Sequence, residues 1–527
     1  MIVFDKAFLN GRFYSMRGEG ETFEAMLVHD GKILATGNNE EIRQYPVRES
    51  IDLEGRAVLP GMIDTHCQIP EMVDDGRKVD LKSARSFADV RKLLGEGLRK
   101  LGTGKWLIGR GLSSMLLAEN AFPDRYELDK VTAEVPIYIT SFDGHSLMGN
   151  SALLKAVGID SSYIPASGEF VEFDGNHEPT GIFKEIAMAK RILDYCPPLY
   201  SDDAECKDAI ESYLRHYTGL GYTTVHSVFG NRPSQLLRAD LYEELEREHR
   251  LPLRINMNWR NQYENGMHLI TGLGSDRLKL GPSKFFSDGA MSECTAYLSK
   301  EYVDRPGTRG SLQQPEEEFR ASVKRAYELG NNVCIHIIGD AALDVVMDLI
   351  EEIMDPERPN RFELLHCAVT RPDQLERLKK LPVLVEKQPI FIQAPNTIHG
   401  EKRLGTLNPY YHSLKSFFDA GIRVAGGTDG PLSDMNPFMG IQCAVTRKSK
   451  DGSVTINPQE RISVYEAVQM FTVNGSYANF EEHLKGTLEP GKLADFIVTE
   501  RDIFESPVDE IGKIKVLAAY VGGEATF

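Results

Sequence analysis

The chain has 527 residues, more than one ordinary hydrophobic core accommodates, so several domains or one barrel with additions are expected. Its 60 basic and 78 acidic side chains give a formal net charge of −18, which argues against nucleic acid and anionic membrane surfaces as partners. Its 7 cysteines include no Cys-x-x-Cys pair, and neither a signal peptide nor a bilayer-spanning run is recognised, so a reducing, cytoplasmic location is expected.

Both ends of the chain have the pattern of short β-strands. Residues 1–57 form apolar stretches separated by turn-forming steps such as Asp30-Gly31 and Glu54-Gly55. Residues 486–527 have the same texture, whereas the middle of the chain differs. The two ends are therefore predicted to pair into one small β-sandwich domain that flanks a central domain of residues 58–485.

The central domain alternates short apolar runs with helical patterns, which is typical of β/α units around a parallel sheet. Clear amphipathic helices are predicted at Glu317–Leu329 and Asp340–Met354. Eight β/α units favour a closed (β/α)8 TIM barrel over an open sheet, and hence an α/β fold. The eight predicted strands are Val58–Asp64, Tyr222–Val228, Leu253–Asn258, Ser283–Asp288, Val333–Ile337, Phe362–His366, Val383–Lys387 and Ile422–Asp429.

The first two predicted strands are separated by far more chain than a simple β/α connection requires. Residues 66–221, approximately, are therefore interpreted as an insertion after the first strand, and loops this long are usually functional or folded in their own right. Within it, a strand is predicted at Pro136–Ser141. The helix Asp203–Leu220 is predicted to lead back into the barrel.

Ionisable side chains gather where the predicted strands end. Barrel enzymes place their catalytic groups at the carboxyl ends of the strands, so residues at these positions converge on one space. Imidazole and carboxylate groups gathered in this way suit a hydrolytic metal site. The candidates are His66, Lys284, His336, His366 and Asp429.

Each candidate also has a structural interpretation. A lone histidine after a strand is more often a hydrogen-bonded structural residue, but His336 and His366 lie in two successive apolar runs, which favours ligation. A buried lysine is costly unless it is paired or modified, and for Lys284 the alternative is an ion pair with Asp288. Asp429, in the sequence GGTDGPL, has the alternative of capping the next helix.

Several motifs along the chain resemble those of a known family. LPGMIDTHCQ, GYTTVHSV, KFFSDGAMSECTAYL, HIIGDAALDVVMDLIE, ELLHCAV, GGTDGPL and GTLEPGKLADFIV occur in the order seen in the amidohydrolase superfamily. They are most similar to the amidohydrolase-3 branch, which contains N-substituted formamide deformylase. The resemblance extends over nearly the whole chain and implies a metal-dependent hydrolase.

The resemblance also implies roles for particular residues. His66 would bind the more buried metal position, and Lys284 would be the bridging position that is often a carboxylated lysine. His336 and His366 would bind the second metal position, and Asp429 would orient and deprotonate the attacking water. Two further histidines, His145 and His226, would face the substrate; packing in the protein core is the alternative for both.

One departure from the family pattern bears on the metal count. The family's first strand normally ends in His-x-His, but here it ends His66-Cys67-Gln68. Glutamine is a weak, neutral ligand, so Gln68 is either a weak or a lost ligand, and one or two divalent ions, with zinc favoured, are expected. A single zinc held by His336 and His366, with Lys284 as an optional third ligand, would still lower the pKa of its bound water towards ~7.

The leading functional hypothesis is hydrolysis of a C–N bond in a small non-peptide amide or formamide. Two alternatives remain open: an isomerase or lyase that uses the same scaffold, and a metal-free binding or regulatory protein. A small-molecule substrate is the expected partner, and a homodimer is compatible with a barrel of this size.

Overall fold

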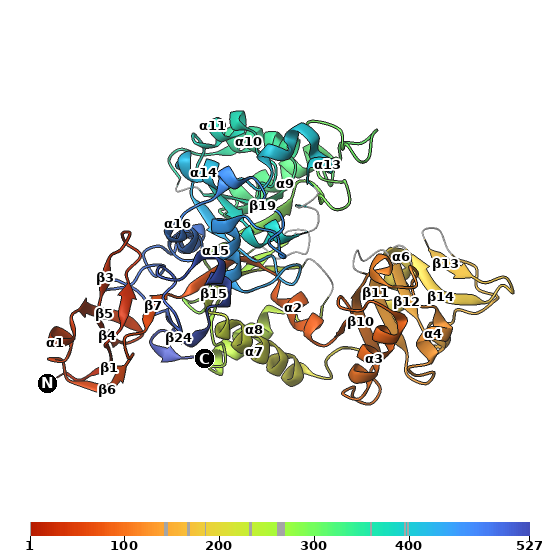
Figure 1. Cartoon of the computed structure of the whole chain (residues 1–527), viewed down its shortest axis with the longest axis horizontal. Coiled ribbons are helices and arrows are strands. Elements are labelled where there is room, and N and C mark those ends of the chain that lie inside the picture. The colour runs from red at the N-terminus through yellow and green to blue at the C-terminus, as the bar shows by residue number, and fades with distance from the viewer. Residues whose placement is uncertain are drawn as a thin grey trace. The chain divides into compact units, whose positions relative to one another are not determined.

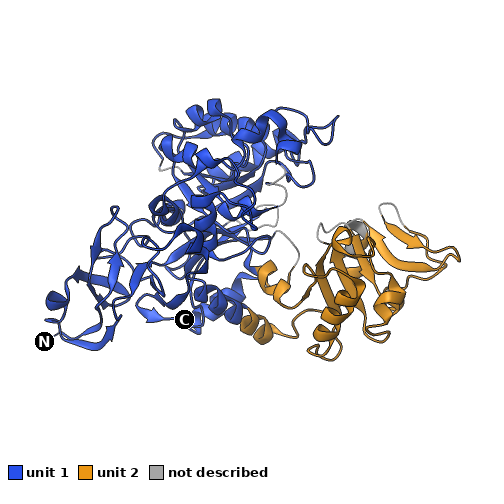
Figure 2. Ribbon diagram, viewed as in Figure 1, with its two compact units in different colours: residues 1–69, 210–233, 237–527 blue, residues 70–209, 234–236 orange. Residues whose placement is uncertain are grey.

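The computed structural model describes residues 2–141, 146–165, 169–184, 186–230, 234–260, 269–358, 361–394, 397 and 400–527. The chain divides into two compact units (Figure 2). Unit 1 consists of Met1–Ile69, Ile210–Pro233 and Leu237–Phe527, and unit 2 of Pro70–Ala209 with Ser234–Leu236. Within the described residues, no helix is both long and apolar enough to cross a membrane.

Strands from both chain ends form two β-sheets in unit 1 (Figure 1). One sheet has the order β5-β4-β1-β6, with β1 Phe4–Leu9, β4 Ala25–His29, β5 Lys32–Gly37 and β6 Val47–Asp52. The other has the order β25-β24-β23-β7-β2-β3, with β2 Arg12–Tyr14, β3 Thr22–Phe23, β7 Ala57–Pro60, β23 Phe496–Thr499, β24 Val516–Val521 and β25 Glu524–Ala525. Phe8 of the first sheet and Phe496 of the second pack edge to face in one shared core, with ring centroids 4.8 Å apart.

The first predicted strand, Val58–Asp64, is in fact two strands in different sheets. β7 ends at Pro60 and pairs antiparallel with β23, whereas β8, Met62–Cys67, pairs parallel with β15. Gly61 separates them, and a Cβ there would lie 2.0 Å from the Thr223 hydroxyl oxygen, so only glycine fits this close approach. The prediction was wrong because both strands are buried and apolar, which leaves no break in the hydrophobic pattern.

The rest of unit 1 is built on parallel strands. One sheet has the order β17-β16-β15-β8, and the other the order β18-β19-β20-β21-β22. Isolated parallel bridges join Cys67 of the edge strand β8 to Gly430, and Arg260, directly after β16, to Lys284, so two bridges link the sheets. The strands are β15 Tyr222–Phe229, β16 Arg254–Trp259, β17 Leu278–Leu280, β18 Ser283–Phe286, β19 Val333–Ile337, β20 Phe362–His366, β21 Val383–Lys387 and β22 Val424–Gly426.

Helices alternate with these strands, as an α/β fold requires. α10, Asp340–Ile353, buries Leu343, Val346 and Ile350, which is the stripe that its 3.6-residue period predicts. The remaining helices are α1 Asn39–Ile42, α7 Asp203–Gly219, α8 Ala239–Arg247, α9 Glu316–Glu328, α11 Pro372–Leu378, α13 Gly400–Leu404, α14 Lys415–Asp419, α15 Pro437–Thr446, α16 Val464–Met470 and α17 Val473–Ala478, with 3-10 turns η2 Pro389–Gln393, η3 Gly405–Tyr410, η4 Pro458–Glu460 and η5 Val508–Lys513.

Unit 2 has a sheet of its own, in the order β13-β14-β12-β11-β10-β9. Separate apolar clusters pack in this unit, one around Tyr138 and Phe183 and the other around Leu94 and Ile139. The predicted strand Pro136–Ser141 is present as β11, Ile137–Ser141. The other elements are α2 Ile69–Gly76, β9 Val79–Asp80, α3 Phe87–Leu98, β10 Leu107–Leu112, η1 Ser114–Leu116, α4 Arg125–Asp129, β12 Ser146–Gly149, α5 Ser151–Val157, β13 Phe170–Phe173, β14 Pro179–Lys184 and α6 Ile186–Leu193.

Candidate metal centre

Three of the predicted site residues form one buried cluster. His66 on β8, His366 at the end of β20 and Asp429 beyond β22 each offer a ligand atom, and these atoms lie within 4.8 Å of one another. His66 Nε2 is 3.3 Å from Asp429 Oδ1, and the rings of His66 and His366 meet edge to face with centroids 5.3 Å apart. Side chains from three distant parts of the sequence thus converge at the carboxyl ends of parallel strands.

The backbone around Asp429 is held by β8. The Asp429 amide donates to the His66 carbonyl at 2.7 Å. Two residues before His66 on β8, buried Asp64 accepts hydrogen bonds from the Thr428 amide at 2.9 Å and from the Thr428 hydroxyl at 2.6 Å. Burial raises the pKa of Asp64 to about 6, although these bonds oppose the rise. Asp64 was not singled out from the sequence; its only signal was a charge inside an apolar run.

His366 and Asp429 have left-handed backbone conformations, with φ of 68° and 55°. Non-glycine residues adopt this region rarely, and such strain collects at functional sites. Gln388, which follows β21, accepts a hydrogen bond on Oε1 from His366 Nδ1 at 2.6 Å. This bond places the proton on Nδ1 and leaves the lone pair on Nε2, the usual arrangement behind a metal-binding histidine.

His336 lies beside this cluster and is not one of its three members, and Lys284 interacts electrostatically with His66, His336 and His366. The His336 and His366 rings are 4.7 Å apart between centroids. His336 Nε2 lies 3.0 Å from the Gly289 carbonyl, so it carries the proton, and its lone pair is on Nδ1. Lys284 Nζ is buried and has no hydrogen-bond partner in the described part of the chain.

The alternative ion pair between Lys284 and Asp288 is not what the structure contains. Asp288 accepts from the backbone amides of Ile338 at 2.9 Å and Gly339 at 2.8 Å, and so fixes the loop after β19. Lys284 Nζ instead lies 4.7 Å from the centre of the Phe286 ring. Burial lowers the pKa of Lys284, which favours the neutral amine.

Gln68 contacts the cluster through its amide. Its Nε2 donates to Asp429 Oδ1 at 3.1 Å, so the nitrogen end of the amide faces the carboxylate. An amide in this position restrains the carboxylate and leaves it fewer orientations. Gln68 is therefore a hydrogen-bond donor to Asp429 in this arrangement, at the position where the family pattern has a histidine.

The two predicted substrate-facing histidines have different outcomes. His145 lies outside the described residues. His226, on β15, is completely buried, and neither ring nitrogen has a hydrogen-bond partner within the described residues. Burial lowers the pKa of His226 to about 3. Its role towards a substrate stays a prediction.

The electrostatics of the cluster suit a cation. Burial lowers the pKa of His66, brings that of His336 to about 3 and holds that of His366 well below its usual value. All three imidazoles are therefore neutral at pH 7, as a metal ligand must be. His66 Nδ1 and Lys284 Nζ are buried without partners in the described structure, so the donor set fits a divalent cation.

Two buried carboxyl groups near the cluster were also not predicted from the sequence. Glu363 on β20 and Glu386 on β21 are completely buried. Burial and their mutual repulsion raise the pKa of Glu363, and burial raises that of Glu386 to about 8. The available signal was a charged residue inside each of two buried strand patterns, and both residues place a polar group in the protein interior.

Buried imidazoles and a carboxylate at the carboxyl ends of parallel strands define the class: an α/β protein with a candidate hydrolytic metal centre. The chain belongs to the amidohydrolase family, whose model matches residues 49–527. It is 28% identical over 535 residues to "Putative amidohydrolase YtcJ" of Bacillus subtilis (strain 168), covering 99% of each chain. It is 25% identical to "N-substituted formamide deformylase" of Arthrobacter pascens, covering 98% of this chain and 97% of that one.

A solved structure has the same fold. The crystal structure of an uncharacterized metal-dependent hydrolase from Pyrococcus horikoshii OT3 superposes with a TM-score of 0.80 at 26% identity, covering 96% of this chain and 99% of that chain. Family and neighbour together support a hydrolase and a divalent metal.

Proposed function

We propose that this protein hydrolyses a C–N bond in a small non-peptide amide or formamide, with one divalent cation, zinc by preference, held by His66 and His366 beside Asp429. The proposal rests on one observation: three buried ligand atoms from distant parts of the chain lie within 4.8 Å of one another. Family membership and the similarity to a formamide deformylase favour the C–N bond. We also propose that the two linked parallel sheets form one closed barrel.

Each residue of the site has a separate role in the proposed reaction. A divalent cation at this site would polarise the substrate carbonyl and lower the pKa of water. Asp429 takes the proton of the attacking water and passes it to the leaving amine. Its Oδ1 is occupied by Gln68 and faces His66, so we assign proton transfer to Oδ2. Lys284 and His336 would lie beside such a cation.

The first test is chemical. Protein purified without chelator is analysed for metal by mass spectrometry and is then screened against formamides and small amides in ¹⁸O-labelled water. One metal per chain and solvent oxygen in the carboxylate product are expected. Turnover without solvent oxygen would indicate the isomerase or lyase alternative, and absence of metal with no rescue by zinc would indicate the metal-free alternative.

The second test is a pair of matched variants. Asp429→Asn should lower kcat by about 10²–10⁴-fold with metal content retained, because it removes the proton acceptor. Asp194→Asn changes an exposed aspartate and serves as the control. Equal activity of the two variants would remove Asp429 from the mechanism.

A further inference from the structure

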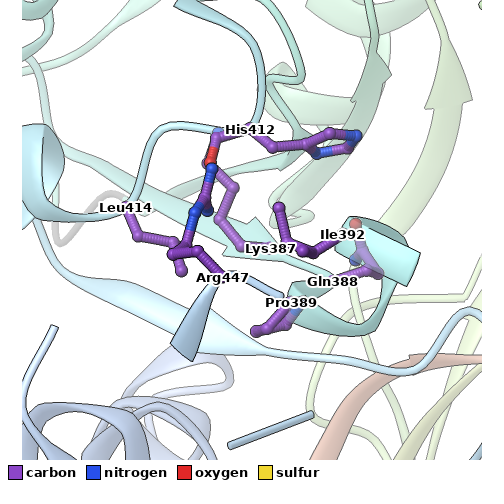
Figure 3. A pocket seen from close by; sticks show the side chains of 7 residues that line it. All are labelled: Lys387, Gln388, Pro389, Ile392, His412, Leu414 and Arg447. Carbon is purple, nitrogen blue, oxygen red and sulfur yellow. The ribbon is translucent and has the colours of Figure 1, made fainter. Parts of the chain in front are cut away.

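A small cavity lies beyond β21, on the far side of the hydrogen bond that orients His366. It is lined by Lys387, Gln388, Pro389, Ile392, His412, Leu414 and Arg447 (Figure 3). Its free volume is about 10 Å³, which is close to the minimum that holds one water molecule.

Two buried cationic side chains line this cavity, and within the described residues both donate hydrogen bonds only to uncharged groups. Arg447 is completely buried; its Nε donates to the Ile456 carbonyl at 3.0 Å and its Nη1 to the His412 carbonyl at 2.8 Å. Lys387 Nζ donates to the Cys367 carbonyl at 2.7 Å. The cavity lining, as far as the structure describes it, contains no aspartate or glutamate.

Glu460 is an acid that interacts with both cations, and its oxygens already accept hydrogen bonds. They accept from the amides of Leu414 at 2.9 Å and Ser416 at 3.0 Å and from the Ser416 hydroxyl. One carboxylate held in this way offsets part of two buried positive charges. The cavity therefore keeps an excess of positive charge, which is costly to bury unless an anion balances it.

Two residues of this lining each carry a buried donor without a partner. Arg447 Nη2 and Gln388 Nε2 are buried and have no hydrogen-bond partner among the described residues. Because Gln388 Oε1 accepts from His366, its Nε2 is the end of the amide left to donate. A buried donor without an acceptor is unfavourable, and here two of them belong to residues that line one cavity.

We propose that this cavity binds one monoatomic anion, a halide of the chloride kind, between Arg447, Lys387 and the amide of Gln388. The anion accepts from Arg447 Nη2 and Gln388 Nε2 and balances the two cations. It thereby keeps the Gln388 amide turned with its oxygen towards His366. The consequence for metal binding, that the halide holds His366 in the tautomer with a free Nε2, rests on the proposed function.

Bromide provides a direct test that needs neither metal nor turnover. Crystals of the full chain soaked in sodium bromide should give an anomalous peak within hydrogen-bonding distance of Arg447 Nη2 and Gln388 Nε2. In solution, chloride should raise the melting temperature when ionic strength is kept constant with gluconate, because a ligand stabilises the state that binds it. A water molecule refined in the cavity without an anomalous peak, or a polyatomic anion in its place, would overturn the proposal.

Variants test the assigned donors. Gln388→Glu keeps the acceptor for His366 and places a negative charge beside the cavity, so chloride affinity should fall by at least about tenfold. Arg447→Met should abolish the chloride response; since Arg447 also holds two loops, the Gln388 variant carries the test if that protein does not fold. Arg247→Met, at an exposed arginine with a side chain 68% accessible, is the control. An unchanged chloride response in Gln388→Glu would refute the site.

Discussion

Replacing Gln68 by glutamate tests the assignment of its amide nitrogen to Asp429. Gln68→Glu is isosteric and places a second carboxylate where Nε2 now lies 3.1 Å from Asp429 Oδ1. At an effective dielectric constant of 20, two charges at that distance repel by about 5 kcal/mol, equivalent to roughly four pH units as an upper bound. Two carboxyl groups this close share a proton, so the variant should hold one that the wild-type site does not.

The assay is the pH dependence of kcat/KM for the amide that the substrate screen identifies, with metal content measured at each pH. The acid limb of the profile should move to higher pH by about 2–3 units in Gln68→Glu. Gln68→Met is the matched control: it removes the donor without adding charge, so activity falls by about 10-fold or more while the acid limb stays in place. If both variants have the same acid limb, the amide does not face Asp429.

Three further outcomes follow from the structure. His226→Asn should make the stability of the protein depend less on pH. Burial lowers the pKa of His226 to about 3, so the neutral folded form contributes stability that is complete above about pH 6.5 and is lost as pH falls towards 3, by about 2 kcal/mol at pH 5. Melting temperatures of the metal-free wild type and variant that fall equally between pH 7 and 5 would contradict this. Gly427→Ala should lower kcat by about 10²-fold, because a Cβ there lies 2.8 Å from His66 Cβ, whereas Gly175→Ala, with open space around it, should leave kcat unchanged. Removal of metal by a chelator should abolish turnover and lower the melting temperature, and zinc should restore both; full activity of metal-free protein would exclude metal dependence.

The positions of the buried strands could be predicted well from the sequence. Val333–Ile337, Phe362–His366 and Val383–Lys387 have the bounds expected of them, because each is a short apolar run between helical patterns. The first run failed at Pro60-Gly61, where the chain passes from one sheet to another. Hydrophobicity reports burial and does not report which sheet a strand joins.

The membership of the site could be predicted better than its bonds. Strand ends meet at one edge, so the convergence of His66, His366 and Asp429 follows from their places in the sequence. The partner of each nitrogen does not, because it depends on loops that cross from neighbouring strands. The Gly289 carbonyl accepts a hydrogen bond from His336, and the Gln388 amide oxygen accepts one from His366; neither partner has a fixed spacing from its histidine.

The position of Asp429 is set by a neighbouring strand more than by its own. β22 ends at Gly426, before Asp429, and the following residues bond to β8: Thr428 to Asp64, and the Asp429 amide to the His66 carbonyl. These bonds join the backbones that carry His66 and Asp429. They therefore set the separation of the two side chains. His366 comes from β20 and has its own orienting partner, Gln388. The site is therefore assembled from one pair of residues whose backbones are hydrogen-bonded to each other and one imidazole with a separate partner, and we expect a bound cation to fix the distance between those two parts.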